Sequence, residues 1–91
     1  MIAAAEAAGL VGGIFTVKFR CLRSFKRGGF HLLEADGAAF DAAIPLSVYR
    51  SLPGSLEFEG RTIEATGIIE LYKGRPQIMV GVPVQLRSAE R

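Results

Sequence analysis

The stretch from Ile14 to Phe25 alternates between apolar and polar side chains. The apolar positions are Phe15, Val17, Phe19 and Cys21, and the polar positions between them are Thr16, Lys18 and Arg20. A period of two, carried by β-branched and aromatic residues, predicts a half-buried strand. We therefore expect the apolar series to face a core, in which Cys21 serves as a small hydrophobic residue.

Two turn signals follow this strand. The glycines at the end of residues 26–29 suit a tight hairpin turn, which makes residues 30–35 a second strand. Asp36 and Gly37 are the strongest short-range hairpin signal in the chain, because both central positions of a type I′ turn need positive φ. A third strand then carries Phe40, Ala42 and Ile44. The first half of the chain predicts a three-stranded meander.

A short helix is predicted next. Pro45 suits the first helical turn, where its missing N–H would have had no partner. Leu46, Tyr49 and Leu52 follow at helical spacing until Pro53 and Gly54 end the run. We expect a helix of about two turns.

The second half again alternates. One face of the run after Gly60 holds Ile63, Ala65, Gly67, Ile69 and Leu71, and the other holds Thr62, Glu64, Thr66 and Glu70. Residues 72–75 turn the chain, and a last run carries Ile78, Val80, Val82, Val84 and Leu86. Pro76 and Pro83 fit this run only at a strand start, edge or bulge. Five strands with one helix between the third and fourth predict an all-β, five-stranded OB-fold Greek-key barrel.

Residues 60–78 carry a resemblance to a known family. Their distinctive positions are Gly60, Arg61, Thr62, Ile63, Thr66 and Gly67, followed by Tyr72, Gly74, Arg75, Pro76, Gln77 and Ile78. This pattern resembles the end of bacterial OB-fold nucleic-acid-binding domains of the tRNA-anticodon-binding-like group. The resemblance extends over about residues 12–87 and implies the fold and, more loosely, nucleic-acid binding. It divides the chain into an Ala-rich N-terminal segment (1–11), a barrel (12–87) and a C-terminal tail (88–91).

Register assigns sides to the second strand. If Asp36 and Gly37 form a two-residue turn, Leu33 faces Phe40 and points inward, and so does His31, near the barrel mouth. A three-residue turn over residues 26–28 gives the same sides, with Phe30 and Leu32 pointing outward beside Lys18 and Arg20. A bulge in the first strand would reverse this assignment.

Charge is distributed unevenly along the 91 residues, although the net charge is only +2. Residues 15–33 hold five cations and no acid, residues 34–70 are acidic, and the chain from Lys73 onward is basic again. No apolar run reaches the roughly 18 residues that span a bilayer. The N-terminal segment carries Glu6 and has no cation before its apolar stretch, so we expect no secretory signal, no membrane association and a cytoplasmic location.

The two basic segments meet on the predicted barrel. The usual OB ligand surface is bordered by the loop between strands one and two and the loop between strands four and five, here residues 25–29 and 72–75. Cations there would release counterions from a polyanion, and exposed aromatic rings would stack on bases. The candidate nucleic-acid-binding residues are Lys18, Arg20, Arg23, Phe25, Lys26, Arg27, Phe30, Tyr72, Lys73 and Arg75.

The sequence thus predicts a module that binds single-stranded DNA or RNA without sequence specificity. It contains no phosphate-loop, zinc-protease or catalytic-triad pattern, so we expect no catalytic residues, no metal and no cofactor. An alternative is a protein-interaction or oligomerisation barrel within a larger protein, which would use Phe30, Leu32 and Met79 as an exposed apolar surface. Ordinary solubilising charge in the turns, and core packing of Phe25 and Phe30, remain open as well.

Overall fold

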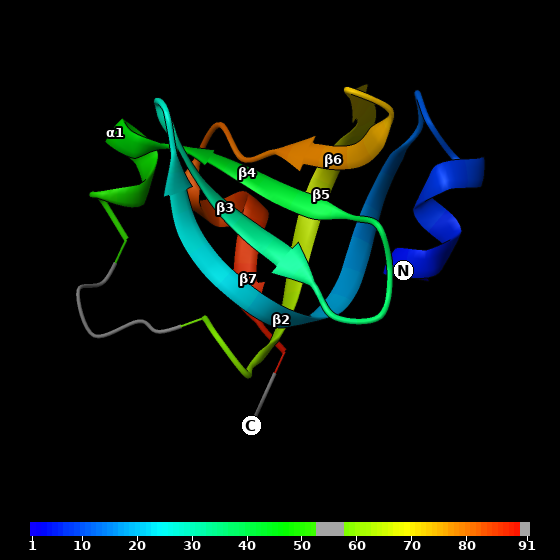
Figure 1. The fold of residues 1–91 in the computed structure, drawn as a ribbon, viewed down its shortest axis with the longest axis horizontal. Coiled ribbons are helices and arrows are strands. Elements are labelled where there is room, and N and C mark those ends of the chain that lie inside the picture. The colour runs from blue at the N-terminus through cyan, green and yellow to red at the C-terminus, as the bar shows by residue number, and fades with distance from the viewer. Residues whose placement is uncertain (53–57, 90–91) are drawn as a thin grey trace.

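The computed structural model describes residues 1–52 and 58–89 (Figure 1). Most of the described chain is β-strand. The elements in chain order are β1 (Ile2–Ala3), the 3-10 helix η1 (Ala4–Gly9), β2 (Ile14–Arg27), β3 (Phe30–Ala35), β4 (Asp41–Pro45), α1 (Leu46–Tyr49), β5 (Thr62–Tyr72), β6 (Arg75–Met79), the 3-10 helix η2 (Pro83–Gln85) and β7 (Leu86–Ser88).

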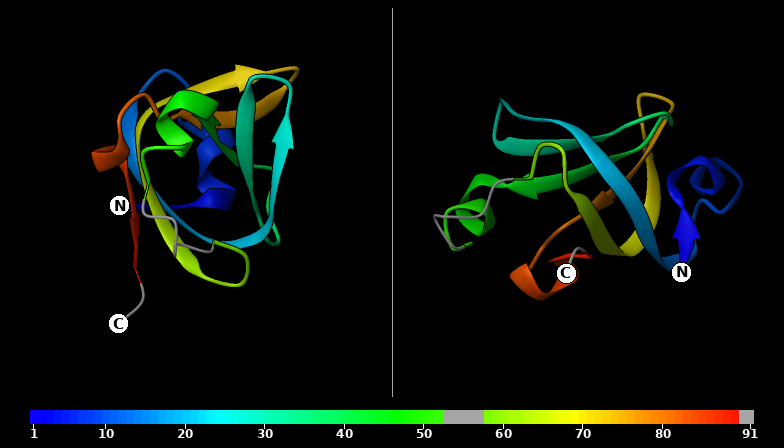
Figure 2. Two further views of the ribbon diagram at one scale, coloured as in Figure 1. Left: turned by 90° about the vertical axis from the view of Figure 1, so that its left-hand side faces the viewer. Right: turned by 90° about the horizontal axis from the view of Figure 1, so that it is seen from below.

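Five of these strands form a closed ring. Their order is β2-β3-β4-β6-β5, and β5 returns to pair with β2 (Figures 1 and 2). β4 and β6 pair in parallel, and the other pairings of the ring are antiparallel. β1 adds to β2 and β7 adds to β5, so the described sheet has seven strands where the sequence predicted five. β1 has two residues and β7 has three. Strands this short are not detected from a period-two pattern in the sequence.

β2 serves two neighbours in succession. Its first half pairs with β5 from Ile14 to Arg20, and its second half pairs with β3 from Cys21 to Arg27. A bulge between Cys21 and Arg23 separates the halves, so Leu22 is an extra residue in this strand. A bulge bends and twists its strand, which allows one long strand to turn around the ring.

A bulge in the first strand was expected to exchange the inward and outward residues of the second strand. The bulge is present, but the inward and outward residues of β3 are those first predicted. The turn between β2 and β3 is Gly28-Gly29 alone, since Arg27 pairs with Phe30. This turn is one residue shorter than the expected one, and the difference offsets the extra residue in β2. Leu33 is fully buried, as predicted, and His31 on the same side is half-buried. The expected neighbours of Phe30 and Leu32 were wrong: Arg27 and Phe25 lie beside them, not Lys18 and Arg20.

The hairpin between β3 and β4 also differs from the prediction. Leu33 pairs with Ala42, two residues beyond the expected Phe40. Gly37 has a positive φ of 76° but Asp36 does not, so the predicted type I′ turn is wrong. The Asp36 N–H instead donates to the Arg20 carbonyl at 2.8 Å, which extends the contact with β2 and lengthens the loop. A shift of two residues preserves the inward and outward sides.

The predicted helix is present but shorter than two turns. α1 spans Leu46–Tyr49, with Pro45 just before it, and hydrogen-bonded turns continue to Leu52. The Pro53-Gly54 stop signal lies outside the described residues. α1 lies at one end of the ring, whereas η1 lies at the other (Figure 1).

The last predicted strand is interrupted. β6 ends at Met79, and Pro83 then begins η2 before β7. The Gln85 side chain holds this corner, because its Oε1 accepts from the N–H groups of Gly81 and Val82. Val82 and Val84, expected to be part of the buried series, are exposed as a result.

The core fills the ring. Its largest fully buried side chains are Val17, Cys21, Leu33, Phe40, Ile44, Ile63, Ile69, Ile78 and Val80. Phe19 meets Phe40 edge to face, with ring centroids 5.3 Å apart. The Ala-rich N-terminal segment contributes Ala4 and Ala7 to this core, and Ile2 pairs with Val17. No helix in the described part of the chain is both long enough and apolar enough to cross a membrane.

Candidate functional site

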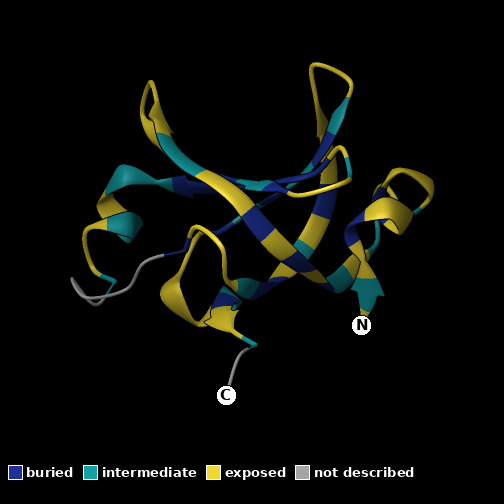
Figure 3. Cartoon of the chain, turned by 60° about the horizontal axis from the view of Figure 1, so that its bottom comes forward, coloured by how far each residue is buried: buried dark blue, intermediate teal, exposed yellow. Residues whose placement is uncertain are grey.

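A groove of about 470 Å³ lies between the two hairpin turns that the sequence singled out. The β2–β3 and β5–β6 turns project on the same side of the molecule from opposite ends of the sheet, and both tips are exposed (Figure 3). They therefore face each other across the groove. The lining residues are Arg27, Gly28, Gly29, Phe30, Leu32, Asp41, Ala43, Tyr72, Lys73, Arg75, Gln77 and Met79.

The floor of the groove is apolar. Register places Leu32 between Phe25 and Ala43, and Met79 beside Ala43, so these side chains share the outer face of β2, β3, β4 and β6. Leu32 points outward, as predicted, yet only 8% of it is exposed because neighbouring strands surround it. Phe30 is 38% exposed, next to the β2–β3 turn. The groove thus offers apolar surface beside an accessible aromatic ring.

Each turn pairs a cation with an aromatic ring. The Arg27 guanidinium lies 5.2 Å from the centre of the Phe25 ring, and the Lys73 ammonium lies 5.5 Å from the centre of the Tyr72 ring. Tyr72 is 55% exposed. Lys73 has φ +51°, a left-handed conformation that is uncommon for residues other than glycine. This conformation sets the course of the tight turn that carries Lys73 into the groove wall.

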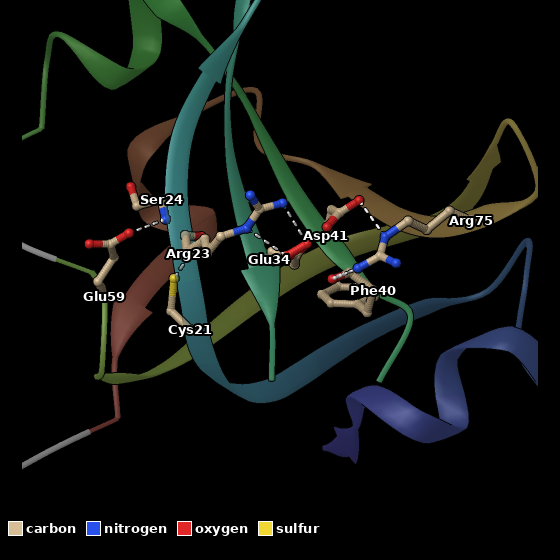
Figure 4. A network of polar contacts seen from close by, with 8 residues as sticks. All are labelled: Cys21, Arg23, Ser24, Glu34, Phe40, Asp41, Glu59 and Arg75. Carbon is tan, nitrogen blue, oxygen red and sulfur yellow. Dashed lines mark hydrogen bonds and ion pairs between the residues drawn. The ribbon is translucent and has the colours of Figure 1, made fainter. Parts of the chain in front are cut away.

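A row of charged side chains, Arg23, Glu34, Asp41 and Arg75, crosses β2, β3, β4 and β6 (Figure 4). Asp41 and Arg75 in this row line the groove. Arg23 donates two hydrogen bonds to Glu34, both 3.0 Å. Arg75 donates to Asp41 at 2.7 Å and to the Phe40 carbonyl at 3.3 Å. The hydrogen bond from Arg23 lowers the pKa of the Glu34 carboxyl. Both arginines therefore already hold a carboxylate.

Another polar cluster lies on the inward side of the same hairpin. His31 hydrogen-bonds the Ser24 hydroxyl and stacks on Tyr49 of α1, with ring centroids 3.8 Å apart. Burial lowers the pKa of the His31 imidazole. Lys26 pairs with His31 in the ladder and so lies on this side, away from Phe25 and Arg27. The cluster joins α1 to the hairpin at the mouth of the ring.

Lys18 and Arg20 lie on a different surface. They belong to the half of β2 that pairs with β5, where their partners in the ladder are Glu64 and Thr62. Glu64 also holds Arg87 of β7 in an ion pair of 2.8 Å. Neither Lys18 nor Arg20 lines the groove.

Five of the ten predicted binding residues therefore line one groove, namely Arg27, Phe30, Tyr72, Lys73 and Arg75. Phe25 borders it through its ladder partner Leu32, whereas Arg23 lies beyond it beside Glu34. Lys18, Arg20 and Lys26 lie elsewhere. Asp41, Ala43 and Gln77 also line the groove but were not among the residues predicted from the sequence. Their positions on the outward side of β4 and β6 were the available signal, because residues of one parity share a face.

Cys21 plays the core role that its position predicted. It is only 1% exposed, and burial, with the nearby Glu59 and Glu34 carboxylates, raises the pKa of its thiol to about 11. A thiol with so high a pKa carries little of the reactive thiolate at neutral pH.

Comparison with known proteins bears on the fold. No protein-family model matches the sequence, and no curated protein matches it either. Solved structures do match, among them an OBody, AM1L10, bound to hen egg-white lysozyme. The two chains are 18% identical, the match covers 97% of this chain and 89% of the OBody, and the TM-score is 0.67. At that identity the likeness shows a shared all-β fold.

Proposed function

We propose that this protein is an OB-type barrel that binds single-stranded nucleic acid in the groove between its two projecting turns. The observation that carries the proposal is the meeting of Arg27 and Lys73, from turns far apart in sequence, across a floor with accessible aromatic rings. The resemblance of residues 60–78 to bacterial nucleic-acid-binding domains supports the same assignment.

The chemistry of the groove suits a single strand better than a duplex. Phe30 and Tyr72 are exposed, and stacking on such rings is worth about 1–3 kcal/mol per base for any base. Met79 is half-buried and lines the same groove, so it can pack on an unpaired base face, which a duplex keeps hidden. Arg27 and Lys73 lie in the two turns that border the groove, where each would neutralise a phosphate.

The test is binding of fluorescein-labelled oligo(dT) and oligo(rU) at rising salt concentration. We expect affinity to fall as salt rises, and the variant R27E/K73E to bind at least about 100-fold more weakly, because it replaces two phosphate contacts with repulsion. The matched control is K18E/R20E, which makes the same charge change on the other surface and should stay within about threefold of wild type. Absence of binding by wild type at low salt would refute the proposal.

A second candidate is a protein-binding module. The apolar groove floor favours it, and the OBody with the same fold is bound to a protein, lysozyme. The partner would be a second copy of this chain or another domain of a larger protein. A stable dimer in light scattering, disrupted by Phe30→Glu and unaffected by salt, would favour this candidate over nucleic acid.

A further inference from the structure

The charged row beside the groove contains an unfavourable contact at its centre. Glu34 and Asp41 are directly opposite each other in the β3–β4 ladder, on the same outward face. Like charges in such a pair destabilise a sheet. Arg23 on one flank and Arg75 on the other each bond one of the two carboxylates, and this offsets the repulsion.

This arrangement changes how the cations around the groove act. Arg75 lines the groove but its charge is balanced by Asp41, and Arg23 is balanced by Glu34. Within residues 1–52 and 58–89, no ion pair engages Arg27 or Lys73. Two of the four cations are therefore available to a polyanion without breaking an existing pair.

The carboxylates also mark a boundary on the sheet. Along the outward side of β3, Phe30 and Leu32 line the groove, and Glu34, the next outward position, does not. A single-stranded nucleic acid that lay in the groove and extended past Leu32 would bring its phosphates close to Glu34 and Asp41. That part of the nucleic acid would gain no net attraction, because each carboxylate already neutralises an arginine and a phosphate could pair with that arginine only by displacing the carboxylate.

We infer that Glu34 and Asp41 form a charge barrier that limits the bound ligand to a short single-stranded segment contacting two cations, Arg27 and Lys73. The inference rests on the proposed function and deepens it, because it states how much of a strand the site accepts. Asp41 lines the groove and Glu34 lies just beyond it, so the barrier stands at this end of the groove.

The salt dependence of binding gives this barrier a measurable value. Each phosphate neutralised in a single strand contributes about −0.7 to the slope of log K against log salt, so two cations predict about −1.4 for wild type. In E34Q/D41N, Arg23 and Arg75 become available and the predicted slope is about −2.8. Affinity at low salt should rise, and it should continue to rise with oligonucleotide length beyond the length at which wild type reaches its limit.

The experiment measures these slopes with labelled oligo(dT) of increasing length, on proteins whose thermal melts confirm folding. The single variants E34Q and D41N should each give about half of the change, which provides a readout if the double variant does not fold. The matched control is E64Q, since Glu64 also holds an arginine, Arg87, but on the surface formed with β7. It should leave the slope unchanged.

A further variant distinguishes the release of Arg23 from its ion pair from a general effect of net charge. R23Q should have no effect on the wild-type slope, and in the E34Q/D41N background it should remove about 0.7 of the gain. Wild-type binding with an unchanged slope in E34Q/D41N would overturn the barrier alone. An equal change in E64Q would do the same, by showing that only net charge matters. If wild type binds no oligonucleotide, the proposed function fails and the barrier fails with it.

Discussion

The two halves of β2 carry the same kind of sequence but form different surfaces. From Ile14 to Arg20 the strand pairs with β5, and its outward cations lie beside Glu64 and Thr62. After the bulge at Leu22 it pairs with β3, and its outward side chains border the groove. Inside the ring the halves differ as well. The first half buries Val17 and Phe19 in the apolar core, whereas the second half reaches the half-buried cluster around His31.

This difference teaches that a run of cations along one strand is not one basic surface. A strand that bends around a ring pairs with one neighbour in its first half and with another in its second half. In β2 the change of neighbour occurs at the bulge. Which cations act together depends on the pairing of each half and cannot be read from their spacing in the sequence.

Deleting single residues from the two regions should give the largest effect. Removal of Lys18 from the regular half reverses the sides of every residue on one side of the deletion, so we expect loss of the cooperative thermal transition. Removal of Leu22 preserves the alternation, because Leu22 is the extra residue of the bulge. That variant should keep a cooperative transition at a lower temperature, monitored by circular dichroism. Equal damage by both deletions would contradict the assigned bulge.

Truncating one phenylalanine in each half should give a smaller, graded contrast. Phe19 is 4% exposed and packs on Phe40, so Phe19→Ala should lower the free energy of unfolding by about 3–5 kcal/mol. Phe25 lies on the outer face under two guanidinium groups, and Phe25→Ala should cost about 1 kcal/mol. Urea unfolding measures both values. A larger loss of unfolding free energy for Phe25→Ala than for Phe19→Ala would contradict the assignment of Phe19 to the core and Phe25 to the outer face.

Acidification should give the smallest effect, through His31 of β3, which hydrogen-bonds Ser24 in the second half of β2. Burial makes the pKa of His31 lower in the folded than in the unfolded protein. As the pH falls, His31 is therefore protonated in the unfolded chain before it is protonated in the folded one, which favours unfolding. Stability is therefore lost as the pH falls from about 7 towards about 5. His31→Gln should show a smaller decrease in melting temperature over this range. An identical decrease would exclude His31 as its source.

Much of the ring was predictable from local pattern. The alternation in β2, β3 and β5 placed Leu33, Ile63 and Ile69 inside, because period two is a direct consequence of strand geometry. The sides of β3 were also correct, although the neighbouring residues were not. The β2–β3 turn is shorter than predicted and the β3–β4 turn is longer, so the predicted partners of β3 were wrong. The assignment of its residues to the inward and outward faces was still correct.

The candidate site was less predictable, for physical reasons. Leu22 follows Cys21 as a second apolar residue in succession, which signals an irregularity but not whether the strand bends there. The ion pairs of Glu34 and Asp41 join strands whose register depends on loop lengths, and the Asp36 hydrogen bond to Arg20 sets one of these. The cations are therefore visible in the sequence, but which of them already hold a carboxylate is not.

The most direct test of the central claim is to map the bound strand onto the protein by ¹⁵N chemical shifts. Titration with unlabelled oligo(dT) should shift the amide signals of Gly28, Gly29, Leu32, Lys73 and Gly74. The signals of Lys18 and Arg20, in the other half of β2, should remain in place. Shifts concentrated at Lys18, Arg20 and Arg87 instead would contradict the account, because they would move the nucleic-acid interface to the opposite half of the strand.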